Sequence, residues 1–181
     1  MTEPVRSVTA YVALGANLGD ALETLRWAAR SLTELGEITG VSRLYHTRPV
    51  GGPPGQPDYL NAVAELQTVL SPLDLLDGLQ SLEHQAGRTR NIRWEARVLD
   101  LDLILYGEAV IASERLSVPH PLAWERGFVL APLHDLAPAL SNPVTGQTVA
   151  QALGQVDQTG IVAGSGPWLG GAAPDALLSG I

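Results

Sequence analysis

The chain of 181 residues contains no cysteine. It therefore has no disulfide framework, no thiolate nucleophile and no zinc or iron–sulfur site held by cysteine. Lysine is absent as well, because all 11 basic residues are arginines, and this excludes a Schiff-base lysine and the lysine of a P-loop. The general absence of lysine is what a GC-rich genome, which favours arginine codons, would produce.

Long apolar segments are also missing. No apolar run approaches the ~18 residues that span a bilayer, and the N-terminal MTEPVRSVTAYV lacks a basic region followed by an apolar block. We therefore expect a cytoplasmic protein that does not enter membranes. The formal net charge of -8 argues against binding to nucleic acid or to a membrane surface, since both require a positive field.

The hydrophobic periodicity predicts an alternation of strands and helices. In chain order the predicted elements are strand 8–14, helix 20–35, strand 38–46, strand 59–69, helix 71–87 and strand 97–108. Asp20 and Ser71 are typical of helix N-termini, and Gly87 of a helix C-terminus. The order is that of the α+β, ferredoxin-like βαββαβ core. It predicts an antiparallel sheet with helices on one face and the active site on the open face.

Beyond this core we expect a short strand at 110–111 and helices at 127–135 and 149–153. Residues 1–154 are predicted to form a single domain. From Gln155 the composition turns to Gly, Ala, Ser and Pro, which predicts a weakly ordered tail at 155–181. The stretch GSGPWLG at 164–170 lacks the glycine spacing and the preceding strand of a phosphate-binding loop and is assigned to this tail.

The segment RVLDLDLILYGE at 97–108 carries two carboxylates in an otherwise apolar strand. Because side chains alternate along a strand, its leucines from Leu99 to Leu105 are predicted to face the helices, and Asp100 and Asp102 the open face. The roots of the two aspartates are then about 6.5 Å apart. This separation suits divalent cations, and oxygen ligands favour magnesium over zinc. The alternative is an exposed strand face with two solubilising charges.

Four arginines lie just before the aspartates, at positions 88, 90, 93 and 97. Guanidinium groups bind phosphate oxygens in bidentate fashion and stay charged at any working pH. Beside a metal-binding carboxylate pair they would complete a clamp on a polyphosphate. The combination favours phosphoryl-type transfer, which needs alignment and charge neutralisation, over a solvated basic turn.

Four segments of the chain match one family in order and spacing. They are YVALGANLGD, TRPVGGPPGQPDYLNAVAEL, LEHQAGRTRNIRWEARVLDLDLILYGE and LSVPHPLAWERGFVLAPLHDLAP. Over about residues 8–153 the chain thus resembles the bacterial 6-hydroxymethyl-7,8-dihydropterin pyrophosphokinases. The resemblance implies a transferase of folate biosynthesis that moves the β,γ-pyrophosphoryl group of ATP to the hydroxymethyl oxygen of the dihydropterin and releases AMP.

The resemblance also implies roles for individual positions. Asp100 and Asp102 match the ligands of two magnesium ions and, with Arg88 and Arg97, the catalytic set. Matches to the family's contacts with ATP are Gln80, Glu83, Arg88, Arg97, Arg115, His120 and Arg126. Matches to its pterin contacts are the stacking pair Tyr59 and Phe128, the ring-edge partner Asn61, backbone groups near Thr47 and Val50, and the loop aromatic Trp94.

Two other functions are weighed against this one. Glu95 and Ala96 stand where the family commonly has Gly-Pro, which motivates a pterin- or nucleotide-binding module without turnover; the intact aspartates and arginines speak against it. A ferredoxin-like nucleic-acid binder is disfavoured by the net charge and by the missing aromatic signature on the central strands. We expect a monomer whose partners are ATP and the pterin.

Overall fold

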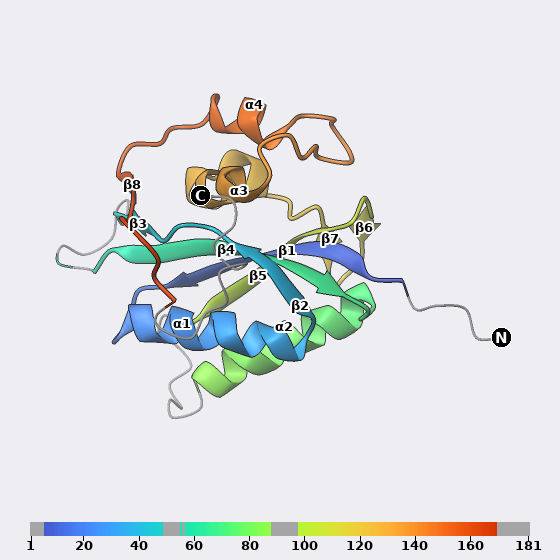
Figure 1. Ribbon diagram of the computed structural model, residues 1–181. Helices are drawn as coiled ribbons and strands as arrows, with labels where there is room; N and C mark the ends of the chain where they lie inside the picture. The colour runs from blue at the N-terminus through green and yellow to red at the C-terminus, as the bar shows by residue number, and fades with distance from the viewer. Residues whose placement is uncertain (1–5, 49–54, 56, 88–97, 170–181) are drawn as a thin grey trace.

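The structure is a computed structural model that describes residues 6–48, 55, 57–87 and 98–169. An antiparallel sheet with strand order β5-β1-β4-β3-β8 forms its centre, and β2 pairs with β4 as well (Figure 1). Its strands are β1 (Val8–Ala16), β2 (Glu37–Val41), β3 (Tyr45–Thr47), β4 (Tyr59–Thr68), β5 (Asp100–Tyr106) and β8 (Ile161–Ala163). A separate hairpin joins β6 (Ile111–Ala112) to β7 (Ser117–Val118).

Three of the four described α-helices begin after a residue whose side chain caps the helix. The α-helices are α1 (Ala21–Ser31), α2 (Pro72–Ala86), α3 (Gly127–Leu136) and α4 (Val149–Leu153), with 3-10 turns η1 (Leu32–Glu34) and η2 (Ala123–Glu125). The predicted caps are confirmed, because the side chains of Asp20 and Ser71 each accept a backbone N–H three residues ahead, over 3.2 Å in both cases. Within the described ranges, no helix is long and apolar enough to cross a membrane.

The predicted ferredoxin-like order of strands and helices is confirmed, except that one predicted strand is divided into two. The predicted strand 38–46 is split into β2 and β3, which both pair with β4. Ser42 lies at the break: its N–H donates to the carbonyl of Val63, and its Oγ accepts from the N–H of Val63, each over 2.9 Å. The break therefore stays anchored to the central strand.

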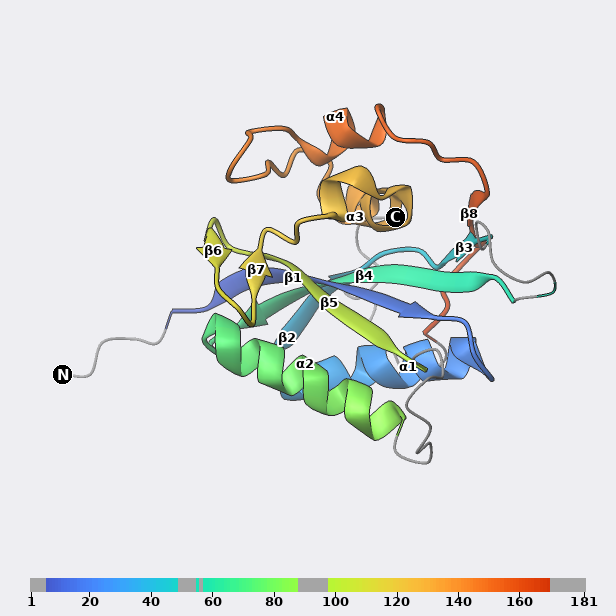
Figure 2. The ribbon, with the colours of Figure 1, turned by 180° about the vertical axis from the view of Figure 1, so that it is seen from behind.

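The two faces of the sheet are both used, as Figures 1 and 2 show. Helices α1 and α2 cover one face, where the larger cluster of buried side chains lies; this first cluster includes Leu25, Leu66 and Leu79. Helices α3 and α4 lie over the other face and bury a second cluster that includes Val63, Ile104 and Leu130. The prediction that the second face is open is therefore wrong for the part under α3, because the mainly apolar α3 needs a surface to pack against.

Strand β5 departs from simple alternation. Tyr11 lies opposite Leu105 but Val12 lies opposite Leu103, so Ile104 is an extra residue in the ladder with β1. Leu99, Leu101 and Leu103 pack in the first cluster as predicted. Leu105 packs in the second cluster, against prediction, because the bulge reverses the alternation after Ile104.

The segment after α4 is also packed, contrary to the expected tail. Strand β8 pairs with β3, and Trp168 and Leu169 are buried in the first cluster at 5% and 2% exposure. The expectation of weak order from Gln155 is therefore wrong for residues 155–169. The rest of that segment, 170–181, lies outside the described residues.

Candidate active site

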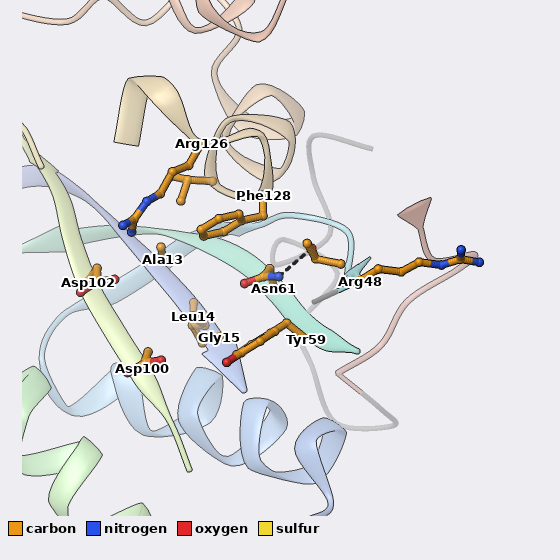
Figure 3. Close-up of a pocket in the computed structure, with 12 residues that line it drawn as sticks. Ala13, Leu14, Gly15, Arg48, Tyr59, Asn61, Asp100, Asp102, Arg126 and Phe128 are labelled. Atoms are coloured by element: carbon orange, nitrogen blue, oxygen red, sulfur yellow. Dashed lines mark hydrogen bonds between the residues drawn. The ribbon is translucent and has the colours of Figure 1, made fainter. Parts of the chain in front are cut away.

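A cavity of about 410 Å³ opens beside the first turn of α3, on the sheet face that α3 covers only in part (Figure 3). Three neighbouring strands of the sheet, the end of β3 and the start of α3 contribute its lining. The lining residues are Ala13, Leu14, Gly15, Thr47, Arg48, Tyr59, Asn61, Asp100, Asp102, Arg126, Phe128 and Val129. Seven sequence-predicted residues are among them: Thr47, Tyr59, Asn61, Asp100, Asp102, Arg126 and Phe128.

The strand register explains why these residues meet. Gly15 of β1 lies opposite Asp100 of β5 on one side and opposite Asn61 of β4 on the other. Two residues earlier, Ala13 lies opposite Asp102. Neighbouring strands are about 4.8 Å apart, so the carboxylate strand and the amide strand stand about 10 Å apart, with only small side chains between them. The floor of the cavity is low because its middle strand carries Gly and Ala.

The aspartate pair occupies the cavity's β5 side. Asp102 is exposed and Asp100 is half-buried, whereas Leu101 between them is 4% exposed and anchors the strand in the first cluster. The N–H of Leu101 donates to Oε2 of Glu83 on α2 over 3.0 Å. The backbone between the two carboxylates is thus fixed by packing on one face and by a side-chain acceptor from a helix. Across the described ranges, no group of three or more His, Asp and Glu side chains could hold a metal ion.

The opposite side of the cavity is aromatic and amide-lined. Phe128 of α3 and Tyr59 of β4 lie on either side of Asn61, and the Arg126 guanidinium lies 5.6 Å from the centre of the Phe128 ring (Figure 3). Nδ2 of Asn61 donates to Oγ1 of Thr47 over 2.9 Å, drawn as the dashed line. Asn61 is 8% exposed, so its orientation is set by this bond and by its neighbours.

His120 lies beside the cavity rather than in its lining. Its backbone N–H donates to the carbonyl of Ile104 over 2.9 Å, and its Nδ1 accepts from the N–H of Leu122 over 3.2 Å. Burial lowers the pKa of His120, the Asp102 carboxylate opposes that shift, and the Arg126 guanidinium adds to it. The neutral ring then carries its proton on Nε2, as a hydrogen-bond donor.

Other predicted nucleotide contacts gather away from the cavity. Arg115 forms an ion pair with Asp77 of α2, and its Nη2 donates to Oε1 of Gln80 over 3.3 Å. Glu83 lies on the same helix and bonds to β5, as described above. The structure therefore brings Gln80 and Arg115 together, but neither lines the cavity. The predicted residues Val50, Arg88, Trp94 and Arg97 lie outside the described residues, as do Glu95 and Ala96.

Some lining residues were not predicted from the sequence. They are Ala13, Leu14, Gly15, Arg48 and Val129. Gly15 was detectable in principle as a glycine inside a strand, which marks a close backbone approach, although the residues opposite it were not. Arg48 was not, and in Figure 3 its guanidinium points away from the aspartates.

Comparison with known proteins gives a consistent result. Residues 11–138 match the family model described as 7,8-dihydro-6-hydroxymethylpterin-pyrophosphokinase. The chain is 46% identical over 138 residues to the 2-amino-4-hydroxy-6-hydroxymethyldihydropteridine pyrophosphokinase of Haemophilus influenzae, covering 75% of this chain and 86% of that one. It is 48% identical over 135 residues to the protein of the same name from Pseudomonas aeruginosa, covering 74% and 83%.

Among solved structures, the fold is similar to that of Plasmodium falciparum HPPK-DHPS. The match to the wild-type crystal structure has a TM-score of 0.68 at 16% sequence identity and covers 85% of this chain. Only 45% of the Plasmodium chain is covered, so the present chain spans less than half of that protein. At this identity the similarity concerns the fold alone.

Proposed function

Since the chain belongs to the 7,8-dihydro-6-hydroxymethylpterin-pyrophosphokinase family, we propose that it transfers the pyrophosphoryl group of ATP to 6-hydroxymethyl-7,8-dihydropterin. The products are AMP and the pterin pyrophosphate, which is a step of folate biosynthesis. One observation carries the proposal at the level of chemistry: an aromatic–amide wall and a carboxylate pair share one cavity floor, two strand spacings apart. Such a floor has room for a flat acceptor and a polyphosphate end to end.

The pterin is assigned to the β4 side of the cavity. A flat heteroaromatic ring with a hydrogen-bonding edge needs aromatic faces and amide-like partners. Tyr59 and Phe128 supply the faces, and Asn61 supplies the partner at the edge. Nδ2 of Asn61 is already bonded to Thr47, so its Oδ1 is the atom available to accept an N–H of the ring. The hydroxymethyl group then extends across β1 toward the aspartates.

Asp100 and Asp102 fit magnesium as ligands. The donors are two hard carboxylate oxygens on one strand face with no third acidic or histidine ligand in the described chain, and magnesium typically takes one or two carboxylates and completes its shell with water and phosphate oxygens. Bound there, magnesium would neutralise charge on the ATP phosphates; a count of two ions is part of the proposal. Leu101 and Glu83 keep the two carboxylates at fixed spacing.

The protein's own share in the reaction is alignment. In the transfer, the hydroxymethyl oxygen forms a bond to the β-phosphorus and releases its proton to solvent, and the bond from that phosphorus to the α-phosphate oxygen breaks as AMP leaves. Arg126 lies near both Phe128 and His120, so we assign its guanidinium to the space between the acceptor and the phosphates. His120 offers Nε2–H as a neutral donor. Positioning and charge neutralisation of this kind are the main catalytic devices of phosphoryl transfer.

The adenosine side of ATP is assigned to the α2 side of β5. Gln80 and Arg115 meet there, and Glu83 follows one turn later on the same helix. Arg88, Trp94 and Arg97 belong to the proposal by family position alone. A cytoplasmic monomer is likewise proposed from the sequence, with a single catalytic domain that includes the packed residues 155–169, and sedimentation velocity tests the monomer.

The experiment that tests the function is a product assay. The protein is mixed with ATP, magnesium and 6-hydroxymethyl-7,8-dihydropterin, and the nucleotides and pterins are separated by chromatography. AMP and pterin pyrophosphate are expected in equal amounts, and only when all three components are present. Pterin binding without turnover would instead support the binding-module alternative, and release of ADP would contradict the proposed reaction.

A further inference from the structure

Strand β8 continues a row of side chains that begins in the cavity. In the sheet register, Tyr59 of β4 pairs with Thr47 of β3, and Thr47 pairs with Ile161 of β8. Directly paired residues project to the same face of a sheet. Ile161 therefore stands on the cavity face, one strand beyond two lining residues, whereas its neighbour Val162 projects to the other face and is 61% exposed.

Ile161 also contacts the start of α3. A Cβ placed on Gly127 would lie 2.7 Å from Cδ1 of Ile161 and 3.1 Å from the carbonyl oxygen of Asp157. Gly127 therefore packs its backbone directly against this side chain, and no other residue type fits there without displacing it. The next residue of α3 is Phe128, one face of the cavity. Ile161 thus lies between the strand that carries Thr47 and the helix turn that carries Phe128.

The segment that holds Ile161 is anchored at both ends. The N–H of Arg48 donates to the carbonyl of Gly160 over 3.2 Å, and the N–H of Gly164 donates to the carbonyl of Leu44 over 2.7 Å. Farther along, Nε1 of Trp168 donates to the carbonyl of Ser42 over 2.9 Å.

Helix α1 holds the end of this segment. Nε of Arg26 donates to the carbonyl of Trp168 over 2.5 Å, and Nη2 of Arg30 donates to the carbonyl of Leu169 over 2.7 Å. Apart from Arg48, which lines the cavity, these anchoring residues lie outside the cavity lining. The segment therefore holds Ile161 at a fixed position against β3 and α3.

We propose that Ile161 is a positioning residue for the acceptor: it sets the spacing between Thr47 and Phe128 and so the affinity of the cavity for the flat ring. The inference rests on the proposed function and extends it to a segment that takes no direct part in the site. The proposal predicts that substitution of Ile161 affects pterin binding but not nucleotide binding. Without the Ile161 side chain, the start of α3 shifts toward β8 and moves Phe128, one of the aromatic side chains that contact the ring. The aspartates on β5, two strands beyond β4, stay in place.

The test compares Ile161→Ala with the matched control Val162→Ala, and Ile161→Val serves as the conservative variant. Dissociation constants are measured calorimetrically for 6-hydroxymethylpterin and, separately, for a non-hydrolysable ATP analogue with magnesium, and KM for both substrates and kcat are measured in the product assay. Unfolding curves for each variant confirm that the temperature of measurement lies below the transition.

For Ile161→Ala we expect the pterin dissociation constant and KM to rise by about fivefold or more. The reason is that even a small displacement of a group that positions a substrate lowers affinity and rate strongly. Nucleotide affinity should stay within about twofold of wild type. Ile161→Val, which removes a single methylene, should weaken pterin binding by a smaller factor than Ile161→Ala, and Val162→Ala should match wild type.

Equal pterin affinity in Ile161→Ala and wild type would overturn the positioning role while leaving the proposed function intact. So would an equal loss for pterin and nucleotide, because that outcome indicates a general structural effect. If Ile161→Ala does not fold, Ile161→Val decides: it must weaken pterin binding by more than it weakens nucleotide binding. Failure of the wild-type protein to bind pterin at all would overturn both the inference and the proposed function.

Discussion

Asn61 and Thr47, from two paired strands, are joined by a hydrogen bond of 2.9 Å from Nδ2 to Oγ1. The bond fixes which end of the carboxamide faces the cavity: the amino group is engaged, and Oδ1 stands near Gly15, where an added Cβ would lie 3.2 Å from it. The site therefore presents a fixed acceptor, already oriented before any ring arrives. Preorganisation of this kind reduces the entropic cost of binding.

Replacing the acceptor should weaken pterin binding selectively. For Asn61→Ala we expect the pterin dissociation constant to rise by about tenfold to 100-fold, since an unpaired donor on the buried ring costs about 1–3 kcal/mol. Thr47→Ser, which keeps the hydroxyl, is the control and should bind the pterin like wild type. Calorimetry with 6-hydroxymethylpterin measures both, and unchanged affinity in Asn61→Ala would show that the ring edge lies elsewhere.

Adding a methyl group to Gly15, on the floor of the cavity, should weaken pterin binding through the same Asn61 carboxamide. Gly15 adopts an ordinary strand conformation, so Gly15→Ala introduces no backbone strain. The added methyl group would lie 3.2 Å from Oδ1 of Asn61 and would make the cavity shallower between the sites assigned to the two substrates. We expect KM for the pterin to rise by several-fold, by about 1 kcal/mol in binding free energy, with little change in the unfolding midpoint. An unchanged KM would mean that the ring does not reach the floor between Asn61 and Gly15.

Neutralising either aspartate should abolish turnover without unfolding the protein. Asp100→Asn and Asp102→Asn keep shape and remove charge, and turnover should fall by at least about 1000-fold because a charge-neutralising centre of the transfer is lost. Glu108→Gln, on an exposed residue just after β5, is the matched control and should retain full activity.

Magnesium titrations of nucleotide binding by calorimetry provide a second readout for these variants. Each aspartate variant should lose the magnesium dependence that the wild type shows, while far-ultraviolet circular dichroism remains unchanged. Full activity in either variant would contradict the metal assignment.

Alkaline pH should weaken the contact between β3 and α3. The phenol of Tyr45 donates to Oδ1 of Asp135 over 2.8 Å, and Arg43 pairs with the same carboxylate over 2.9 Å. Burial and the hydrogen bond to Asp135 raise the pKa of Tyr45 to about 12, above its ordinary value of 10.0. Because the folded-state pKa is the higher one, the stabilisation is complete below pH 10 and is lost as pH rises from 10 toward 12.

Urea unfolding between pH 8 and pH 11.5 measures this loss. The wild-type unfolding free energy should fall over the upper part of the range. Tyr45→Phe should be less stable by about 1 kcal/mol at pH 8, because it lacks the hydrogen bond, and should show a shallower fall above pH 10. The same slope in both proteins would assign the alkaline loss to other groups.

The sequence predicted the parts of the fold that local rules control. Asp20 and Ser71 cap helices because the rule involves three neighbouring residues, and Asp100 and Asp102 share a face because alternation holds over short distances. Leu105 escaped prediction because a single extra residue at Ile104 reverses the alternation, and only pairing with β1 reveals it.

The parts that were missed depend on distant pairing. Gly15 matters because of what stands opposite it on β4 and β5, and a register between strands is not written in any one segment. Strand β8 has three residues in a Gly- and Ser-rich stretch, which is too short for a detectable hydrophobic period. It forms because it pairs with the edge of β3 and because Trp168 packs in the first cluster. Composition predicted a tail where tertiary contacts make a strand.

The reaction itself is tested most directly by the fate of the ATP phosphates. The protein is incubated with magnesium and 6-hydroxymethyl-7,8-dihydropterin, once with ATP labelled in the α-phosphate and once with ATP labelled in the γ-phosphate. Pyrophosphoryl transfer predicts that the α label remains in AMP and that the γ label appears in the pterin product. Recovery of the γ label as inorganic phosphate, or of the α label in ADP, would contradict the account.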